Sequence, residues 1–114
     1  MKLPNKSTLL RIFIGENDRA DGRPLYEVIV LKARERQLAG ATVTRGVLGF
    51  GRSSRLHTAK ILTLSDDLPM VVEIVDSEQH IREFLSEIEG LLGSSLVTLE
   101  KAEVVRYGGN DASS

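Results

Sequence analysis

A helical pattern lies between two strand-like segments in each half of the chain, and this order constrains the fold more than any other feature. In the second half, apolar residues recur with the 3.6-residue helical period until a glycine: Ile81, Phe84, Leu85, Ile88, Leu91, Leu92 and Gly93. We expect Asp76 to cap the start of this helix, with Gln79 reaching back to it. The same period predicts a first helix from Pro24 to about Leu38 and Gly40.

Strands are predicted on both sides of each helix. Alternating or β-branched residues indicate strands at 8–15, 41–48, 70–75 and 96–107, with a short one at 61–64. Because strand crossovers are right-handed, a double βαβ order places both helices on one face of a four-stranded antiparallel sheet. We therefore predict an α+β fold, a ferredoxin-like βαββαβ sandwich over residues 8–107, with residues 1–7 and 108–114 as tails. The other sheet face would be uncovered and partly apolar, which favours self-association.

The composition fits one small domain. The 114 residues include no cysteine, which removes disulfides and thiolate chemistry, and only 4% are aromatic, so the core must be aliphatic. The first seven residues lack the apolar stretch of a secretory signal, and no apolar run approaches the ~20 residues of a membrane span. We expect a cytoplasmic protein.

Charge is unevenly distributed along the chain. The net charge of −1 argues against nucleic-acid binding. Residues 45–60 nevertheless contain four basic residues and no acidic one, namely Arg45, Arg52, Arg55 and Lys60. Residues 61–103 contain ten acidic residues and two basic ones. The positive segment is either an anion-binding loop or simply a solvated basic loop.

Three glycines, Gly46, Gly49 and Gly51, lie in this basic segment between two predicted strands. Glycine lets backbone N–H groups approach an anion closely, and a neighbouring arginine supplies charge-assisted hydrogen bonds. The same glycines would also suit a flexible hairpin tip. A Walker or dinucleotide loop would instead place its glycines between a strand and a helix.

Several chemistries do not fit the sequence. RNA-recognition domains need aromatic residues on their central strands, and residues 70–75 have none. Acylphosphatases need an arginine-bearing phosphate loop directly after the first strand, where this chain is acidic. Nothing rigid would position a hydrolytic triad drawn from Ser53, Ser54, His57 and Asp66, and the two histidines lack ligand-spaced companions. We predict no catalytic residue, no metal site and no enzyme activity, and we expect His80 to be a surface residue.

Several short motifs carry a family resemblance. Gly40-Ala41-Thr42-Val43-Thr44, Gly49-Phe50-Gly51-Arg52 and Leu68-Pro69 leading to Glu73-Ile74-Val75 resemble nitrogen regulatory P-II signalling proteins. The span from Leu10 to Tyr107 is more similar still to an uncharacterised bacterial family of P-II-like proteins, domain of unknown function 190. Its hallmarks stand here as Ile14-Gly15-Glu16, Gly22-x-Pro24-Leu25, Thr44-Arg45-Gly46-x-x-Gly49-Phe50-Gly51 and Asp67-Leu68-Pro69.

The resemblance implies a homotrimer whose sheets pack around a threefold axis, with adenine nucleotides in clefts between subunits. It implies that Gly49, Gly51 and Arg52 cradle the phosphates and that Thr42 lies near the base or ribose. Arg106 would reach the phosphate from its own or a neighbouring subunit. The loop at 49–60 would contact a target protein, such as a membrane transporter or channel.

The chain departs from the P-II pattern at several positions. Ser53 replaces a glutamine that helps bind phosphate or 2-oxoglutarate with magnesium, and residues 92–96 replace a lysine-bearing loop that grips triphosphate. The second C-terminal arginine is missing, and no tyrosine in the loop is available for uridylylation. These differences favour ADP, AMP or a cyclic nucleotide over ATP, with no cofactor required.

Two functions remain open from the sequence. One is a regulatory protein that binds a nucleotide and signals through the loop at 49–60, with residues 52–60 becoming ordered when ligand or partner binds. The other is a small-molecule or anion-handling protein, or a weak enzyme, that uses the same basic loop.

Overall fold

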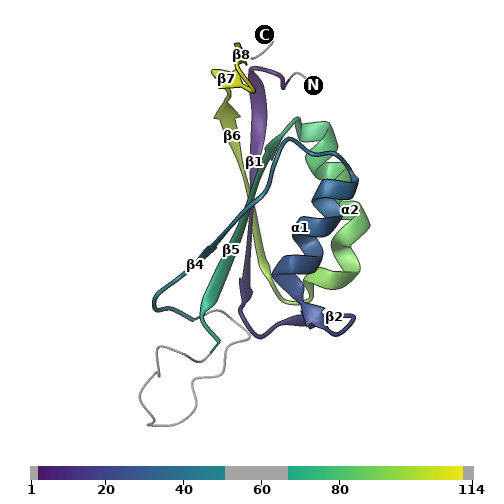
Figure 1. Ribbon diagram of the computed structural model, residues 1–114, viewed down its shortest axis with the longest axis vertical. Coiled ribbons are helices and arrows are strands. Elements are labelled where there is room, and N and C mark those ends of the chain that lie inside the picture. Colours follow the sequence, from purple (N-terminus) through teal and green to yellow (C-terminus); the bar gives the residue numbers. More distant parts are fainter. Residues whose placement is uncertain (1–2, 51–66, 112–114) are drawn as a thin grey trace.

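The computed structural model of the protein describes residues 3–50 and 67–111. Four strands form an antiparallel sheet in the order β4-β5-β1-β6: β4 Thr42–Arg45, β5 Pro69–Asp76, β1 Lys6–Gly15 and β6 Leu96–Glu103. The two helices, α1 Leu25–Glu35 and α2 Glu78–Leu92, lie on the same side of this sheet (Figure 1). This arrangement confirms the predicted α+β, ferredoxin-like sandwich. Among the described residues, no helix is both long and apolar enough to cross a membrane.

The alternation along the strands separates a covered from an uncovered sheet face. In β1, Leu10, Ile12 and Ile14 are buried beneath the helices, whereas the residues between them are half-buried. The register carries this division across the sheet, because directly opposite residues point to the same side. The uncovered face therefore consists of Leu9, Arg11, Phe13, Thr42, Thr44, Val71, Glu73, Val75, Leu96, Thr98 and Glu100.

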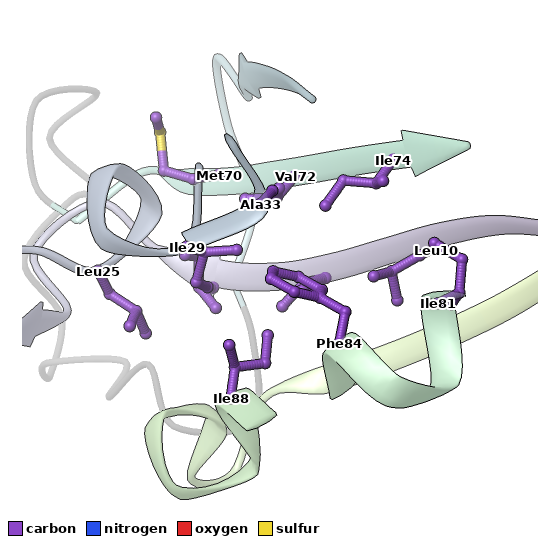
Figure 2. Packing of buried hydrophobic residues seen from close by; sticks show 12 residues of the cluster. Leu10, Leu25, Ile29, Ala33, Met70, Val72, Ile74, Ile81, Phe84 and Ile88 are labelled. Carbon is purple, nitrogen blue, oxygen red and sulfur yellow. The ribbon is translucent and has the colours of Figure 1, made fainter. Parts of the chain in front are cut away.

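The core is aliphatic with a single phenylalanine at its centre. Phe84 and Ile88 of α2 are fully buried and point toward Ile29 of α1 and toward the sheet (Figure 2). The other members of the cluster are Leu10, Ile12, Ile14, Leu25, Ala33, Met70, Val72, Ile74 and Ile81. The core thus fills the space between the helices and the covered face, and no helix of the described residues lies on the uncovered face.

Helix α1 ends earlier than predicted. Gln37 takes a left-handed conformation with φ of 59°, and the amide of Leu38 donates to the carbonyl of Ala33 at 3.1 Å. The amide of Gln37 donates to the carbonyl of Arg34 at 3.0 Å, which completes a Schellman ending without glycine. Leu38 and Gly40 therefore belong to the connector between α1 and β4, not to the helix.

The prediction that Asp76 caps α2 is wrong. Ser77 is the cap, and its hydroxyl accepts the amide hydrogen of His80 at 3.2 Å. Asp76 is instead the last residue of β5, where the alternation turns its carboxylate toward the covered face and leaves it 1% exposed. Strand register, which a local motif does not contain, decides between the two residues.

The remaining differences concern chain segments near the ends of the sheet. β4 ends at Arg45 instead of continuing to residue 48. The amide of Gly46 still donates to the carbonyl of Pro69 at 2.7 Å, but Pro69 has no N–H with which to return a second ladder bond. The polar segment after β1 forms a small hairpin of β2 (Arg19–Ala20) and β3 (Arg23–Pro24). A second hairpin, β7 (Arg106–Tyr107) with β8 (Asn110–Asp111), includes residues that the sequence analysis assigned to the C-terminal tail. At the other end, β1 already begins at Lys6.

Candidate functional site

An open groove of about 480 Å³ lies at the uncovered sheet face, where β5 and β1 meet the connector from α1 to β4. Register explains how it forms: Glu73 of β5 stands opposite Thr42 of β4, and Val75 stands opposite Leu9 of β1. Its lining is apolar except for a few polar side chains and comprises Leu3, Leu9, Ala39, Gly40, Ala41, Thr42, Glu73, Val75 and Tyr107. A small-molecule site typically has this mixture of apolar walls and a few polar groups.

A charged network fixes the acidic side chain of the groove. Arg11 Nε donates to Glu73 Oε2 at 2.8 Å, and its Nη1 also pairs with Glu100 of β6. The hydrogen bond with Glu73 is the largest cause that raises the pKa of the Arg11 guanidinium above its usual value, and the charge of Glu100 adds to it. Arg11 therefore stays charged. From β1 it pairs with Glu73 of β5 and Glu100 of β6, so the network spans three adjacent strands.

The connector wall of the groove is held by side chains from distant elements. The amide of Ala39 donates to Asp76 Oδ2 at 2.9 Å, and its carbonyl accepts from the Tyr107 hydroxyl at 2.8 Å. His80, with half of its side chain exposed, lies 2.8 Å through Nδ1 from Asp76 Oδ1. The expectation that His80 is merely a surface residue missed this contact, although the i,i+4 spacing from Asp76 allows it.

The glycines at the end of β4 pack closely against Pro69. A Cβ atom on Gly46 would lie 2.7 Å from Pro69 Cγ, and one on Gly49 would lie 3.1 Å from the same atom. Beside them, Arg45 Nε pairs with Glu16 Oε2 at 3.0 Å, and Arg45 Nη2 donates to Glu16 Oε1 at 3.2 Å. The chain is thus fixed immediately before residue 51 by a backbone hydrogen bond, an ion pair and glycine packing.

Three of the five predicted site residues lie in the described part of the chain. Thr42 lines the groove, and Arg106 lies in β7 next to Tyr107, which also lines it. Arg106 Nη2 donates to the carbonyl of Gly109 at 3.2 Å. Gly49 lies beyond the end of β4, against Pro69. Gly51 and Arg52 lie outside the described residues, as do the loop at 51–66 and the short strand expected at 61–64.

Gly49 and Arg106 are at opposite ends of the sheet. Pro69, against which Gly49 packs, stands opposite Gly15, whereas β6 ends at Glu103 opposite Lys6, shortly before Arg106. With a rise of about 3.3 Å per residue along β1, these ends are about 30 Å apart. One protomer therefore does not bring both residues to one small ligand.

Sequence reasoning missed Glu73 and Tyr107 as groove residues. Glu73 had a usable signal, because an acid between Val72 and Ile74 in a strand must lie on the opposite face from those apolar neighbours. Tyr107 had none, since it reaches Ala39 only through a hairpin that the sequence did not predict. Within residues 3–50 and 67–111, no group of three or more His, Asp or Glu side chains could hold a metal ion.

Comparisons with known proteins agree with this architecture. The UPF0166 protein of Aquifex aeolicus (strain VF5) is 43% identical over 100 residues, which make up 88% of this chain and 94% of that protein. A PII-like signaling protein from Thermus thermophilus superposes with a TM-score of 0.59 at 17% identity, over 90% of this chain and 91% of that chain. A second similar structure is that of CPII, a nitrogen regulatory PII-like protein from Thiomonas intermedia K12 solved with ADP, AMP and bicarbonate. It superposes with a TM-score of 0.63 at 14% identity, over 89% of this chain and 90% of that chain.

These structural similarities confirm the P-II-like fold. The family model DUF190, described as "Uncharacterized ACR, COG1993", matches residues 7–104, which include both helices and all of the four-stranded sheet except Lys6. The protein therefore belongs to the DUF190 family, as its motifs indicated.

Proposed function

We propose that this protein is a P-II-like regulator, a homotrimer that binds an adenine nucleotide in clefts between its subunits. The observation that carries the proposal is the groove beside Thr42 on the uncovered sheet face. Its volume of about 480 Å³ falls in the range of 300–1,000 Å³ typical of small-molecule sites. Leu9 and Val75 would contact the faces of a base, while Thr42 and Glu73 offer hydrogen bonds to its edge or to the ribose.

The open side of the groove supports an intersubunit site. A groove on an uncovered sheet face leaves one side of a ligand in water, and a second subunit packed on that face would enclose it. Apolar residues on the same face, including Phe13, Val71 and the 60%-exposed Leu96, favour such packing. The separation of Gly49 and Arg106 points the same way, because two subunits would be needed to supply both residues to one nucleotide.

The phosphates would lie at the other end of β4. There Gly49, Gly51 and Arg52 would form the cradle, with Arg106 supplied by a neighbouring subunit. The link from α2 to β6 contains only Gly93, Ser94 and Ser95 and is closed by a hydrogen bond of 2.9 Å from the Ser95 amide to the Leu92 carbonyl. Such a short turn leaves no extended loop to grip a triphosphate, so we propose ADP, AMP or a cyclic nucleotide as the effector. The binding of ADP and AMP by CPII supports this class.

We further propose that the protein signals without catalysis. The loop at 49–60 would change conformation on binding and contact a target protein, such as a membrane transporter or channel, in the cytoplasm. The described residues contain ion pairs that fix structure, such as Arg11 with Glu73, and we assign no acid, base or nucleophile among them.

A thermal-shift screen tests the proposed ligand class. At a ligand concentration about a hundredfold above the Kd, binding should add about 2.7 kcal/mol to the free energy of unfolding, visible as a higher Tm. The screen should contain ADP, AMP, cyclic AMP, ATP, GDP, phosphate and bicarbonate. A shift with adenine nucleotides supports the proposal. Shifts with anions alone would replace it with the anion-handling function, and no shift at all would remove the site.

An Arg52→Ala variant tests the phosphate cradle. The lost charge-assisted hydrogen bond, worth about 1.5–3 kcal/mol, should weaken ADP binding by about 10- to 150-fold. The Tm of the ligand-free protein should stay unchanged. Arg82→Ala is the matched control, because Arg82 forms only an exposed pair with Glu78 on α2. If Arg52→Ala lowers the ligand-free Tm and leaves affinity intact, Arg52 is structural and lies outside the cradle.

A further inference from the structure

The peptide groups of Ala39 are held from two sides by side chains that are remote in sequence. Asp76 accepts its amide hydrogen, and the Tyr107 hydroxyl donates to its carbonyl, at 2.9 and 2.8 Å. These partners are 37 and 68 residues away along the chain. Ala39 is followed directly by Gly40, Ala41 and Thr42, so the held residue begins the wall of the groove.

Asp76 is a rigid anchor for one side of this wall. Its side chain is 1% exposed, and Oδ1 accepts the amide of Ser77 at 2.7 Å and contacts His80 Nδ1 at 2.8 Å. Ser77 and His80 at the start of α2, together with Ala39 of the connector, therefore hold the carboxylate. A buried carboxylate with this many donors has little freedom to move.

Tyr107 holds the other side and also forms part of the groove. It belongs to the hairpin of β7 and β8, where it stands opposite Asn110. Its position next to the end of β6 is supported by the hydrogen bond of 2.8 Å from the Val104 amide to the Asn5 carbonyl. Tyr107 thus lines the groove and also holds the adjoining wall at Ala39.

We propose that Asp76 and Tyr107 are positioning residues of this site, and that docking of the C-terminal hairpin is coupled to its occupancy. The proposal rests on the proposed function. A ligand that contacts both Tyr107 and the Ala39–Thr42 wall binds the docked hairpin better than the undocked one, so it shifts the population toward docking. Because such coupling is reciprocal, a change that loosens the docked hairpin lowers the affinity for the ligand.

Tyr107→Phe tests the proposal with a minimal change, because only the hydroxyl is lost. One neutral hydrogen bond of about 0.5–1.5 kcal/mol corresponds to a rise of about 2- to 10-fold in the Kd for ADP. In the ligand-free protein, hydrogen exchange of peptides covering residues 38–42 and 104–109 should accelerate, while exchange in α2 stays unchanged. Tyr26→Phe is the matched control, since the Tyr26 hydroxyl has no hydrogen-bond partner in the described part of the chain.

The exchange measurement separates this proposal from the proposed function. If the wild-type protein binds neither ADP nor AMP, the proposed function fails, while exchange at 38–42 still decides whether Tyr107 holds the wall. Unchanged exchange and unchanged affinity in Tyr107→Phe would overturn the proposal. Asp76→Asn should also accelerate exchange at 38–42. If Asp76→Asn does not fold, Tyr107→Phe remains decisive. Faster exchange throughout Tyr107→Phe would show a general loss of stability and would also overturn it.

Discussion

An Arg11→Met protein is expected to sediment as a monomer at micromolar concentrations at which the wild type is expected to sediment as the proposed trimer. Arg11 lies at the centre of the uncovered face and is the shared partner of Glu73 and Glu100. Methionine keeps a long unbranched side chain and removes the charge. Glu73 on β5 and Glu100 on β6, the strands on either side of β1, then both lose their cation, and burying them between subunits carries a large desolvation cost.

Sedimentation equilibrium gives the measurement directly, because the monomer has a mass of 12.5 kDa and the trimer three times as much. A combined Arg11→Met, Glu73→Gln and Glu100→Gln protein should recover assembly, since it removes the unpaired charges as well. Arg82→Met serves as the control, because its pair with Glu78 is exposed on α2, far from the uncovered face. A monomeric wild type would refute the trimer. A trimeric Arg11→Met protein would show that Arg11 faces solvent in the assembly.

This experiment also bears on the ligand site. Glu73 lines the groove, and Arg11 is the group that fixes its carboxylate. If the cleft is completed by a second subunit, nucleotide affinity should fall together with assembly in Arg11→Met. The combined variant separates the two effects, because it restores assembly but leaves an amide in place of the Glu73 carboxylate.

The sequence predicted those features that depend on local periodicity. The stripe from Ile81 to Leu92 identified α2 and its end at Gly93, where the structure ends it as well. The order of elements then determined the topology, because right-handed crossovers leave one sheet arrangement for a double βαβ unit. Motif similarity predicted that Thr42 lies near the base or ribose of a nucleotide. The structure shows that Thr42 lines the groove, and its role in binding stays a prediction.

The features that the sequence did not predict depend on contacts between distant residues. Asp and Ser are both residue types that can cap a helix, so residue type does not decide between Asp76 and Ser77. The strand alternation decides, because it buries Asp76 and leaves Ser77 as the cap. Apolar residues follow Arg45 along the chain, but β4 ends there because its next in-register partner is Pro69, which has no N–H to continue the ladder. Tyr107 reaches the groove across 68 residues of sequence through a contact with Ala39. No local pattern encodes these pairings.

Ile88→Ala is expected to cause the largest loss of stability among these variants. Ile88 is 0% exposed and packs between the two helices and the covered sheet face (Figure 2). Truncation removes buried apolar area and leaves a cavity, at a cost of about 2–5 kcal/mol. Because the free energy of unfolding of a native protein is typically about 5–15 kcal/mol, this cost is a large share of the total.

Two matched variants define the scale of that effect. Ile88→Val, which removes one methylene from the same site, should cost about 0.5–1.5 kcal/mol. Leu31→Ala removes a similar side chain from α1 at a position that is 38% exposed, and it should cost about 0.5 kcal/mol or less. Urea unfolding at one fixed protein concentration is the suitable measurement, because assembly makes apparent stability depend on concentration. A smaller loss for Ile88→Ala than for Leu31→Ala would show that the assigned buried face of α2 is wrong.

The comparison of Ile88→Ala with Arg52→Ala separates folding from binding. Ile88 lies on the covered side of the sheet, whereas the groove opens on the other side. Truncating Ile88 should therefore leave the Kd for ADP unchanged under conditions where the protein stays folded. Arg52→Ala should show the reverse, with normal stability and weakened binding. If Ile88→Ala weakens ADP binding under conditions where the trimer is fully folded, the core beneath the sheet and the site above it are coupled. That result would mean that the groove changes shape when the core changes, because a rigid groove would not respond to a substitution in the core.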